Sequence, residues 1–141
     1  MKPTINDCKL LDLPTACDGE SDFSAVTSVP ELPFTIERCF YIYDIPAGDS
    51  RGRHAHKECE QFIVAARGSF NLVLDDGNNT QTIVLDRPYK GVYVPAGIWT
   101  AEENFAAGSV CLVFASHPFD EADYIRDYLL YLDWIDSKSP D

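Results

Sequence analysis

The hydrophobic residues between positions 34 and 115 fall into short segments that glycine, proline and asparagine separate. These segments are rich in β-branched and aromatic residues, which favour strands. The run Asp75-Asp-Gly-Asn-Asn79, between two of them, is typical of a hairpin turn. The predicted strands cover residues 34–44, 61–66, 70–74, 80–85, 91–94 and 110–115. Many short strands separated by turns predict an all-β sandwich or barrel.

The C-terminal segment 120–136 has a different pattern, with apolar residues at helical spacing after an acidic start. It predicts a short helix that packs against its own domain or against a dimer mate. The apolar stripe comprises Tyr124, Tyr128 and Leu132, with Ile125, Leu129 and Ile135 nearby.

The first 33 residues are the least regular part of the chain, because they hold four prolines and a polar run at 18–22. Two short strands are predicted there, at 9–13 and 23–27. We expect residues 1–141 to form one domain, since this length suits a single core. Whether the first 33 residues pack on their own subunit or are exchanged in a dimer stays open at this point.

The net charge of −12 argues against nucleic acid as a partner, because phosphate binding needs a basic face. No apolar run is long enough to predict a membrane span, so no membrane association is expected. The five cysteines are scattered and contain no C-x-x-C pair. Such a pattern suits reduced thiols better than a disulfide framework, and we therefore expect a cytoplasmic protein.

Two of the three histidines, His54 and His56, stand one residue apart in the middle of the chain. On an extended strand they point to the same face, and Glu60, Phe62 and Val64 would share that face if the strand continues without interruption. Such a face predicts the inner wall of a ligand cavity. Three basic residues lie within positions 51–57, on either side of the histidines: Arg51, Arg53 and Lys57. They give this acidic protein a local site for a small anion.

The pattern Gly48-x5-His54-x-His56-x3-Glu60-x7-Gly68 resembles the first cupin motif, and Pro95-x-Gly97-x2-Thr100-x3-Asn104 partly resembles the second. The resemblance implies a cupin jelly roll, also called a double-stranded β-helix, with the short C-terminal helix added. In metal cupins a histidine of the second motif completes the ligand set, and here that position holds Thr100. A metal-dependent small-molecule cupin that uses His54, His56 and Glu60 remains an alternative.

A closer resemblance is to the cupin nucleotide-sugar 3,4-ketoisomerases, which act on dTDP-4-keto-6-deoxyglucose in the synthesis of sugars for surface polysaccharides such as lipopolysaccharide. It covers residues from about 33 to 128. The matching blocks include Pro33-Phe34-x-Ile36-x-Arg38, Arg51-Gly-x-His-Ala-His-Lys57, Gly91-x-Tyr93, Leu112-Val-x-Ala-Ser116 and Phe119-Asp-Glu-x-Asp-Tyr-Ile-Arg126. The resemblance implies a dTDP-linked keto sugar as substrate, a homodimer, and neither a metal nor any other cofactor.

The residue types fit that chemistry, because moving a ketone from C4 to C3 requires removal and return of a proton next to the carbonyl. A neutral histidine can carry that proton, and a second polar group can stabilise the enediolate. By resemblance, His54 is the predicted base and His56 assists proton transfer. The predicted substrate-binding residues are Arg51 and Lys57 at the pyrophosphate, and Arg53, Glu60, Tyr93 and Trp99.

The chain departs from the family at Phe40, where the family usually has a tyrosine that resembles a catalytic contributor. A phenyl ring neither donates nor accepts a proton. This departure keeps a non-catalytic sugar-nucleotide-binding cupin as a further alternative. The nucleobase, the sugar and the stereochemistry of the product stay open in the sequence.

Overall fold

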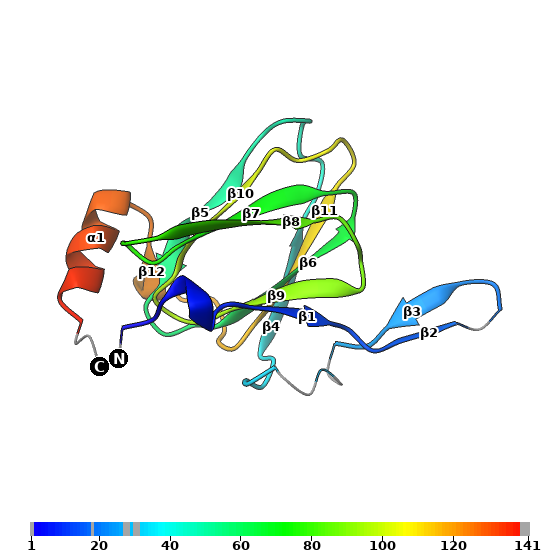
Figure 1. Ribbon diagram of the computed structural model, residues 1–141, viewed down its shortest axis with the longest axis horizontal. Helices are drawn as coiled ribbons and strands as arrows, with labels where there is room; N and C mark the ends of the chain where they lie inside the picture. The colour runs from blue at the N-terminus through cyan, green and yellow to red at the C-terminus, as the bar shows by residue number, and fades with distance from the viewer. Residues whose placement is uncertain (1, 18, 27–28, 30–31, 139–141) are drawn as a thin grey trace.

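The computed structural model describes residues 2–17, 19–26, 29 and 32–138 and shows two five-stranded antiparallel sheets that face each other (Figure 1). The first sheet has the strand order β1-β9-β6-β11-β4 and the second has the order β12-β5-β10-β7-β8. The strands of the first sheet are β1 (Lys9–Asp12), β4 (Arg38–Ile42), β6 (Gln61–Arg67), β9 (Lys90–Val94) and β11 (Val110–Ala115). Those of the second are β5 (Arg51–His56), β7 (Phe70–Asp75), β8 (Thr80–Leu85), β10 (Trp99–Glu103) and β12 (Tyr124–Ile125). The predicted all-β architecture is confirmed.

The main core lies between the two sheets and uses every second residue of their strands. Ile63 and Ala65 of β6 contribute from the first sheet, and Leu72 and Leu74 of β7 contribute from the second. Because side chains alternate along a strand, the neighbours of these residues face outward. The inner cluster thus fixes which residues of each strand point into the barrel.

Each sheet also has a covered outer face. On the first sheet, Phe62 and Val64 pack outward against Leu13 and Val29 of the N-terminal segment. On the second sheet, an outer cluster lies under the C-terminal helix and consists of Ala55, Trp99, Ile125, Tyr131 and Ile135. The N-terminal segment and the C-terminal helix thus cover apolar surface on the outside of the barrel, which would otherwise be exposed to water.

The C-terminal helix α1 spans Tyr128–Asp136 and is therefore shorter than the predicted segment 120–136. Asp127 caps it, because its side chain accepts a hydrogen bond from the Leu130 N–H. The residues before Asp127 form the 3₁₀ turn η2 (Glu121–Asp123) and strand β12, which pairs with β5. Tyr131 and Ile135 form the buried stripe, whereas the predicted stripe residue Leu129 is 72% exposed.

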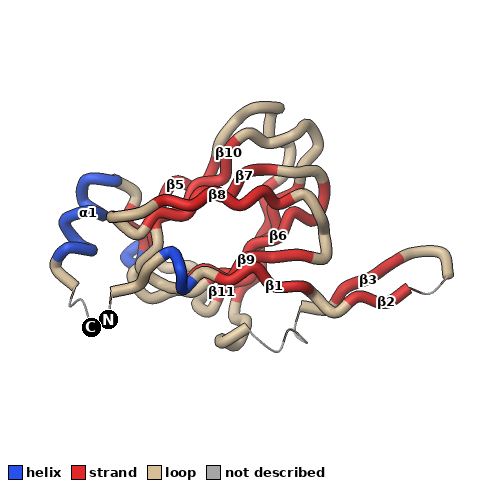
Figure 2. The backbone as a smooth tube through the Cα atoms, viewed as in Figure 1, coloured by secondary structure: helices blue, strands red, loops and turns tan. Residues whose placement is uncertain are grey.

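The N-terminal segment begins with the 3₁₀ turn η1 (Ile5–Asp7) and then adds β1 to the edge of the first sheet. It continues as a hairpin of β2 (Thr15–Cys17) and β3 (Asp22–Ser24), which projects from the barrel on the side away from α1 (Figures 1 and 2). The predicted strand 23–27 is thus shorter and begins earlier, and its end at 27 lies outside the described residues. In the described part of the chain no helix is long and apolar enough to cross a bilayer.

Candidate active site

An irregularity in β5 sets the direction of the histidine side chains. His54 pairs with Thr100 and Arg51 pairs with Glu102, so three steps along β5 face two steps along β10. The extra residue is a β-bulge, and Gly52 takes a positive φ of 70° within it. A Cβ atom at Gly52 would overlap the Glu102 carboxylate, which is buried inside the barrel. The bulge therefore needs glycine both for its backbone conformation and for space.

After the bulge, β5 directs His54 and His56 to the face opposite Ala55, which belongs to the outer cluster. The two imidazole rings meet edge to face with centroids 4.9 Å apart. The ring of Tyr124, from β12, lies 5.1 Å from His54 and 4.3 Å from His56. Three aromatic rings from two adjacent strands thus form one compact group, which we call the histidine cluster.

Asp123 holds His56 in one orientation. Its Oδ2 atom lies 2.9 Å from Nδ1 of His56, and its carboxylate also accepts hydrogen bonds from the backbone N–H groups of Glu58 and Cys59. With Nδ1 bound in this way, Nε2 of His56 is the nitrogen that remains for a ligand. Burial lowers the pKa of His56, and the bond to Asp123 opposes that shift.

Burial keeps the His54 imidazole in its neutral form. Burial is the largest cause that lowers its pKa, to about 3, and the charges of His56, Arg126 and Arg38 add to the shift. An imidazole with such a pKa is unprotonated near neutral pH and can accept a proton from a substrate.

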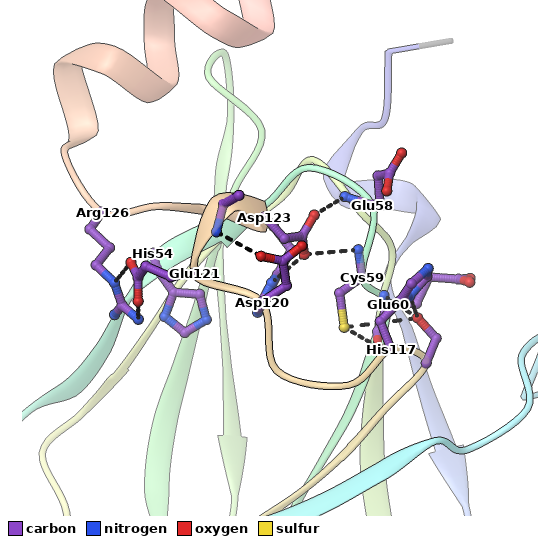
Figure 3. Close-up of polar contacts among 12 residues, drawn as sticks. His54, Glu58, Cys59, Glu60, His117, Asp120, Glu121, Asp123 and Arg126 are labelled. Atoms are coloured by element: carbon purple, nitrogen blue, oxygen red, sulfur yellow. Dashed lines mark hydrogen bonds and ion pairs between the residues drawn. The ribbon is translucent and has the colours of Figure 1, made fainter.

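Two arginines flank the histidine cluster, and the charges of both act on its imidazoles. Arg126 lies with its guanidinium carbon 4.2 Å from the Tyr124 ring centroid and makes a two-point ion pair with Glu121 beside His54 (Figure 3). Arg38 lies over the rings of Phe40 and Phe119, at 5.1 Å and 5.7 Å. These cations favour an anionic ligand or a negative charge that develops during a reaction.

Buried polar atoms without hydrogen-bond partners also occur at the histidine cluster. Among the described residues, four buried side-chain atoms lack a hydrogen-bond partner: Nε2 of His54, Nε2 of His56, Nε of Arg38 and Oε2 of Glu102. Buried polar groups are nearly always paired in folded proteins, so such a group of nitrogens indicates a site for a polar ligand. The predicted pair His54 and His56 is therefore brought together, and Arg38 joins it.

Glu60 and Tyr93 do not share the face of the histidines, contrary to the prediction for Glu60. The Tyr93 hydroxyl donates to the Glu60 carboxylate at 2.5 Å, and the Tyr93 ring packs with the outer cluster of the first sheet. Figure 3 shows Glu60 on the side of the group away from His54. The predicted shared face fails because the chain turns at 57–60 and starts a strand in the other sheet.

Phe62 and Val64 leave the predicted face for the same reason, since they point outward from β6. Trp99 lies under α1, 5.6 Å from the Tyr131 ring, on the opposite face of the second sheet from Thr100 and His54. Trp99 therefore packs under the helix, away from the histidines, and its contact with substrate stays a prediction.

The three basic residues of the predicted anion site spread over the surface. Arg51 donates to the Ser50 carbonyl and pairs with Asp49, and Arg53 pairs with Glu103 at 3.9 Å. Lys57 lines a surface hollow of about 260 Å³ with Tyr124, Arg126, Leu130 and Trp134. Among these three, Lys57 alone borders residues of the site described above.

The alternative metal centre of His54, His56 and Glu60 does not fit the structure, because Glu60 lies away from the imidazoles and is bound by Tyr93. Within the described residues, one group has metal-ligating atoms within 4.8 Å of one another, and it consists of His56, Cys59 and Asp123. Its Asp123 oxygens already accept hydrogen bonds from His56 and from two backbone N–H groups.

Sequence reasoning assigned no role in the site to Arg38, Asp123, Tyr124 or Arg126. All except Arg38 belong to the Asp-Tyr-Ile-Arg block, which carried the family resemblance but was expected to be helical. In the structure Asp123 ends the turn η2, and Tyr124 and Ile125 pair with β5, so this block reaches the histidines. The distinctive motif itself was the available signal, because a packing helix does not require those particular residues.

Comparison with known proteins agrees with this geometry. The family model described as FdtA, WxcM-like, C-terminal, matches residues 6–136. A TDP-4-oxo-6-deoxy-alpha-D-glucose-3,4-oxoisomerase from Aneurinibacillus thermoaerophilus is 39% identical over 120 residues, which are 85% of this chain and 86% of that protein.

Solved structures give the same result. A 3,4-ketoisomerase from Helicobacter canadensis superposes with a TM-score of 0.88 and 38% identity, over 93% of this chain and 98% of that one. A mutant of the 3,4-ketoisomerase QdtA from Thermoanaerobacterium thermosaccharolyticum, in complex with TDP-4-keto-6-deoxyglucose, has a TM-score of 0.88 and 28% identity, over 96% of this chain and 98% of that one. The predicted cupin jelly roll is confirmed, and the chain belongs to the FdtA, WxcM-like family of cupin-type sugar-nucleotide 3,4-ketoisomerases.

Proposed function

We propose that this protein isomerises a dTDP-linked 4-keto-6-deoxy sugar to the 3-keto sugar. The observation that carries the proposal is the buried, neutral His54, whose Nε2 lacks a partner and which lies beside His56 and two cations. The relatives that share the fold over most of the chain act as 3,4-ketoisomerases or 3,4-oxoisomerases, which supports the reaction class.

In the proposed reaction, Nε2 of His54 removes the proton from C3 of the sugar. The C–H electron pair forms the C3–C4 double bond, and the electrons of the C4 carbonyl move onto its oxygen. The proton of the 3-hydroxyl passes to that oxygen, with His56 assisting. His54 then returns its proton to C4, and O3 becomes the new carbonyl. Atoms and charge balance, so the step as proposed requires no metal and no redox cofactor.

The nucleotide half of the substrate accounts for the basic surroundings. A diphosphate carries charge that Lys57 and Arg126 can neutralise, since both line the hollow next to Tyr124. Arg51 and Arg53 stay predicted contacts, and their present partners are exposed surface carboxylates that a diphosphate can displace.

We also propose a homodimer in which the N-terminal hairpin packs on a second subunit. The hairpin projects from its own barrel (Figure 1) and carries Phe23 with 58% of its surface exposed. Light scattering after size exclusion would show twice the chain mass, and a Phe23→Ser variant would weaken the dimer. A monomeric wild-type protein at micromolar concentration would refute this part of the proposal.

The cellular setting is the cytoplasm, where free thiols persist; the five cysteines are all free in the structure. We place the reaction in the synthesis of amino sugars for lipopolysaccharide or another surface polysaccharide. Fractionation of the native cells, and analysis of the surface sugars after deletion of the gene, would test these two statements.

The decisive test is proton NMR of dTDP-4-keto-6-deoxyglucose in deuterated water with metal-free protein. We expect loss of the C3 proton signal and a new 3-keto product, and neither with His54→Asn. Nucleotide binding without exchange would instead indicate a sugar-nucleotide-binding cupin without catalytic activity. Exchange that appears only after addition of a divalent metal would contradict the metal-free reaction proposed here.

A further inference from the structure

Arg38 is a partly buried cation to which the structure gives no ion-pair partner within the residues it describes. Its Nε atom is buried and has no hydrogen-bond acceptor. Arg126, in contrast, has its guanidinium bound at two points by Glu121. A buried N–H donor of a cation is costly to leave without an acceptor, so this arrangement favours a bound anion, or one that forms during the reaction, next to Arg38.

The backbone of β4 directs Arg38 into the mouth of the barrel. Phe40 and Ile42 pack against the inner cluster, whereas Tyr41 is 61% exposed on the outside. Arg38 stands two residues before Phe40 and therefore shares the inner face. Its charge is close enough to lower the pKa of both His54 and His56. The cation and the predicted base thus face the same space from opposite sheets.

Phe40 provides the surface that holds this cation. The guanidinium carbon of Arg38 lies 5.1 Å from the Phe40 ring centroid and 5.7 Å from that of Phe119. Stacking on two rings restrains a guanidinium without using its N–H groups, which remain available as donors. Phe40, which stands where the family usually has a tyrosine, therefore holds the Arg38 guanidinium in place.

We propose that Arg38 is the electrophile of the reaction and that its N–H groups donate to the sugar oxygens on which negative charge develops. This inference rests on the proposed function. When His54 takes the C3 proton, the electron pair of the C4 carbonyl moves onto O4, and Arg38 stabilises that oxyanion while it stays protonated itself. It stabilises O3 in the same way before C4 is reprotonated. Arg38 thereby supplies the stabilisation that a tyrosine hydroxyl at position 40 would otherwise give.

The alternative ligand for Arg38 is the diphosphate of the substrate. Kinetic measurements distinguish diphosphate binding from stabilisation of the oxyanion. An oxyanion donor acts mainly in the transition state, so its loss lowers kcat and leaves substrate binding largely intact. A diphosphate contact raises KM and weakens binding of dTDP itself. The test therefore measures kcat, KM, the C3 exchange rate and the Kd for dTDP on the same variants.

We expect Arg38→Ala to lower kcat and C3 exchange by roughly 100-fold to 1000-fold, as for loss of one oxyanion donor, with the Kd for dTDP changed less than about threefold. Added guanidinium ion at millimolar concentration should restore part of the exchange. Arg38→Lys keeps the charge without the planar donor pair, and it serves if Arg38→Ala fails to fold. Arg87→Ala, at an exposed position after β8, is the matched control and should match the wild type.

Phe40 is tested by two substitutions. Phe40→Tyr keeps an aromatic surface under Arg38 and Phe40→Leu removes it, so exchange should be at least about tenfold faster in Phe40→Tyr than in Phe40→Leu. Equal rates in these two variants, or a Phe40→Tyr variant far faster than the wild type, would overturn the proposed arrangement.

Two outcomes identify which idea fails. If the wild type and Arg38→Ala exchange the C3 proton equally fast, the role of Arg38 is overturned but the proposed function stands. The same holds if Arg38→Ala loses dTDP binding but keeps its kcat. A wild-type protein that binds dTDP without any exchange overturns the proposed function, and the inference falls with it.

Discussion

Nδ1 of His56 lies 2.9 Å from Oδ2 of Asp123, and this contact joins two segments that are 67 residues apart in the sequence. The same carboxylate accepts the backbone N–H groups of Glu58 and Cys59. One side chain therefore fixes the orientation of an imidazole and the turn that follows β5.

Asp123→Asn should lower kcat at least about tenfold, because an amide can present its NH₂ group to Nδ1 and reverse the tautomer of His56. It should also destabilise the fold by about 1–3 kcal/mol, since an amide oxygen cannot accept all of these hydrogen bonds. Kinetics together with ¹⁵N spectra of the imidazoles would measure both effects. Asp133→Asn, at an exposed position of α1, is the control; an unchanged tautomer with full activity in Asp123→Asn would contradict the assigned role.

The pH dependence of the reaction follows from His54. Since burial lowers its pKa to about 3, kcat/KM should stay level from pH 8 down to about pH 5. In the unfolded chain histidine titrates near pH 6.5, so below this pH the unfolded state binds a proton that the folded state does not bind. The folded state therefore loses stability as the pH falls below 6.5, by about 2 kcal/mol at pH 5.

Urea unfolding and kcat/KM at several pH values would check this prediction. His54→Asn should lose less stability between pH 7 and pH 5 than the wild type does. A fall in kcat/KM with a midpoint near 6.5 would show that the imidazole titrates as it does in water.

Glu102 should make the protein sensitive to alkaline pH. Complete burial raises its pKa to about 8, and its partner within the barrel is the Cys111 thiol at 3.7 Å. The folded state therefore binds a proton that the unfolded chain has released, and stability is lost as the pH rises from about 4.5 to 8. Between pH 5 and 8 the loss is about 3 kcal/mol.

Glu102→Gln stays neutral at every pH and should remove this part of the pH dependence. Its neighbour Glu103, which faces outward and pairs with Arg53, provides the control Glu103→Gln. Denaturant unfolding at pH 5 and pH 8 compares the three proteins. If Glu102→Gln and the wild type lose the same stability between these pH values, the carboxyl is already ionised in the folded protein.

Gly52→Ala should damage both stability and activity, because a methyl group there overlaps the buried Glu102 carboxylate in a left-handed backbone conformation. We expect a loss of about 3 kcal/mol or more. Gly48 has a similar φ of 84° but open space around it, so Gly48→Ala should cost only about 1–2 kcal/mol. Thermal unfolding would compare them, and equal costs would show that the bulge has room to adjust.

The sequence by itself determined the strand content, the pairing of His54 with His56 on one face, and the family. These features depend on local pattern, since strand propensity, the alternation of side chains and a contiguous motif need no knowledge of distant residues. Strands β8 and β11 appear with the predicted bounds, 80–85 and 110–115. Catalysis by the two histidines stays a prediction.

Only the tertiary structure decided which other residues join the histidines. The turn at 57–60 places Glu60 just before a strand of the other sheet, and β10, which is absent from the predicted strands, buries Glu102 inside the barrel. Likewise, residues 124 and 125 pair with β5 instead of continuing the helix, and this pairing brings Asp123 and Tyr124 to His56. Hydrogen bonds between distant strands override local helical preference, because a sheet edge next to β5 would otherwise keep unpaired N–H and C=O groups.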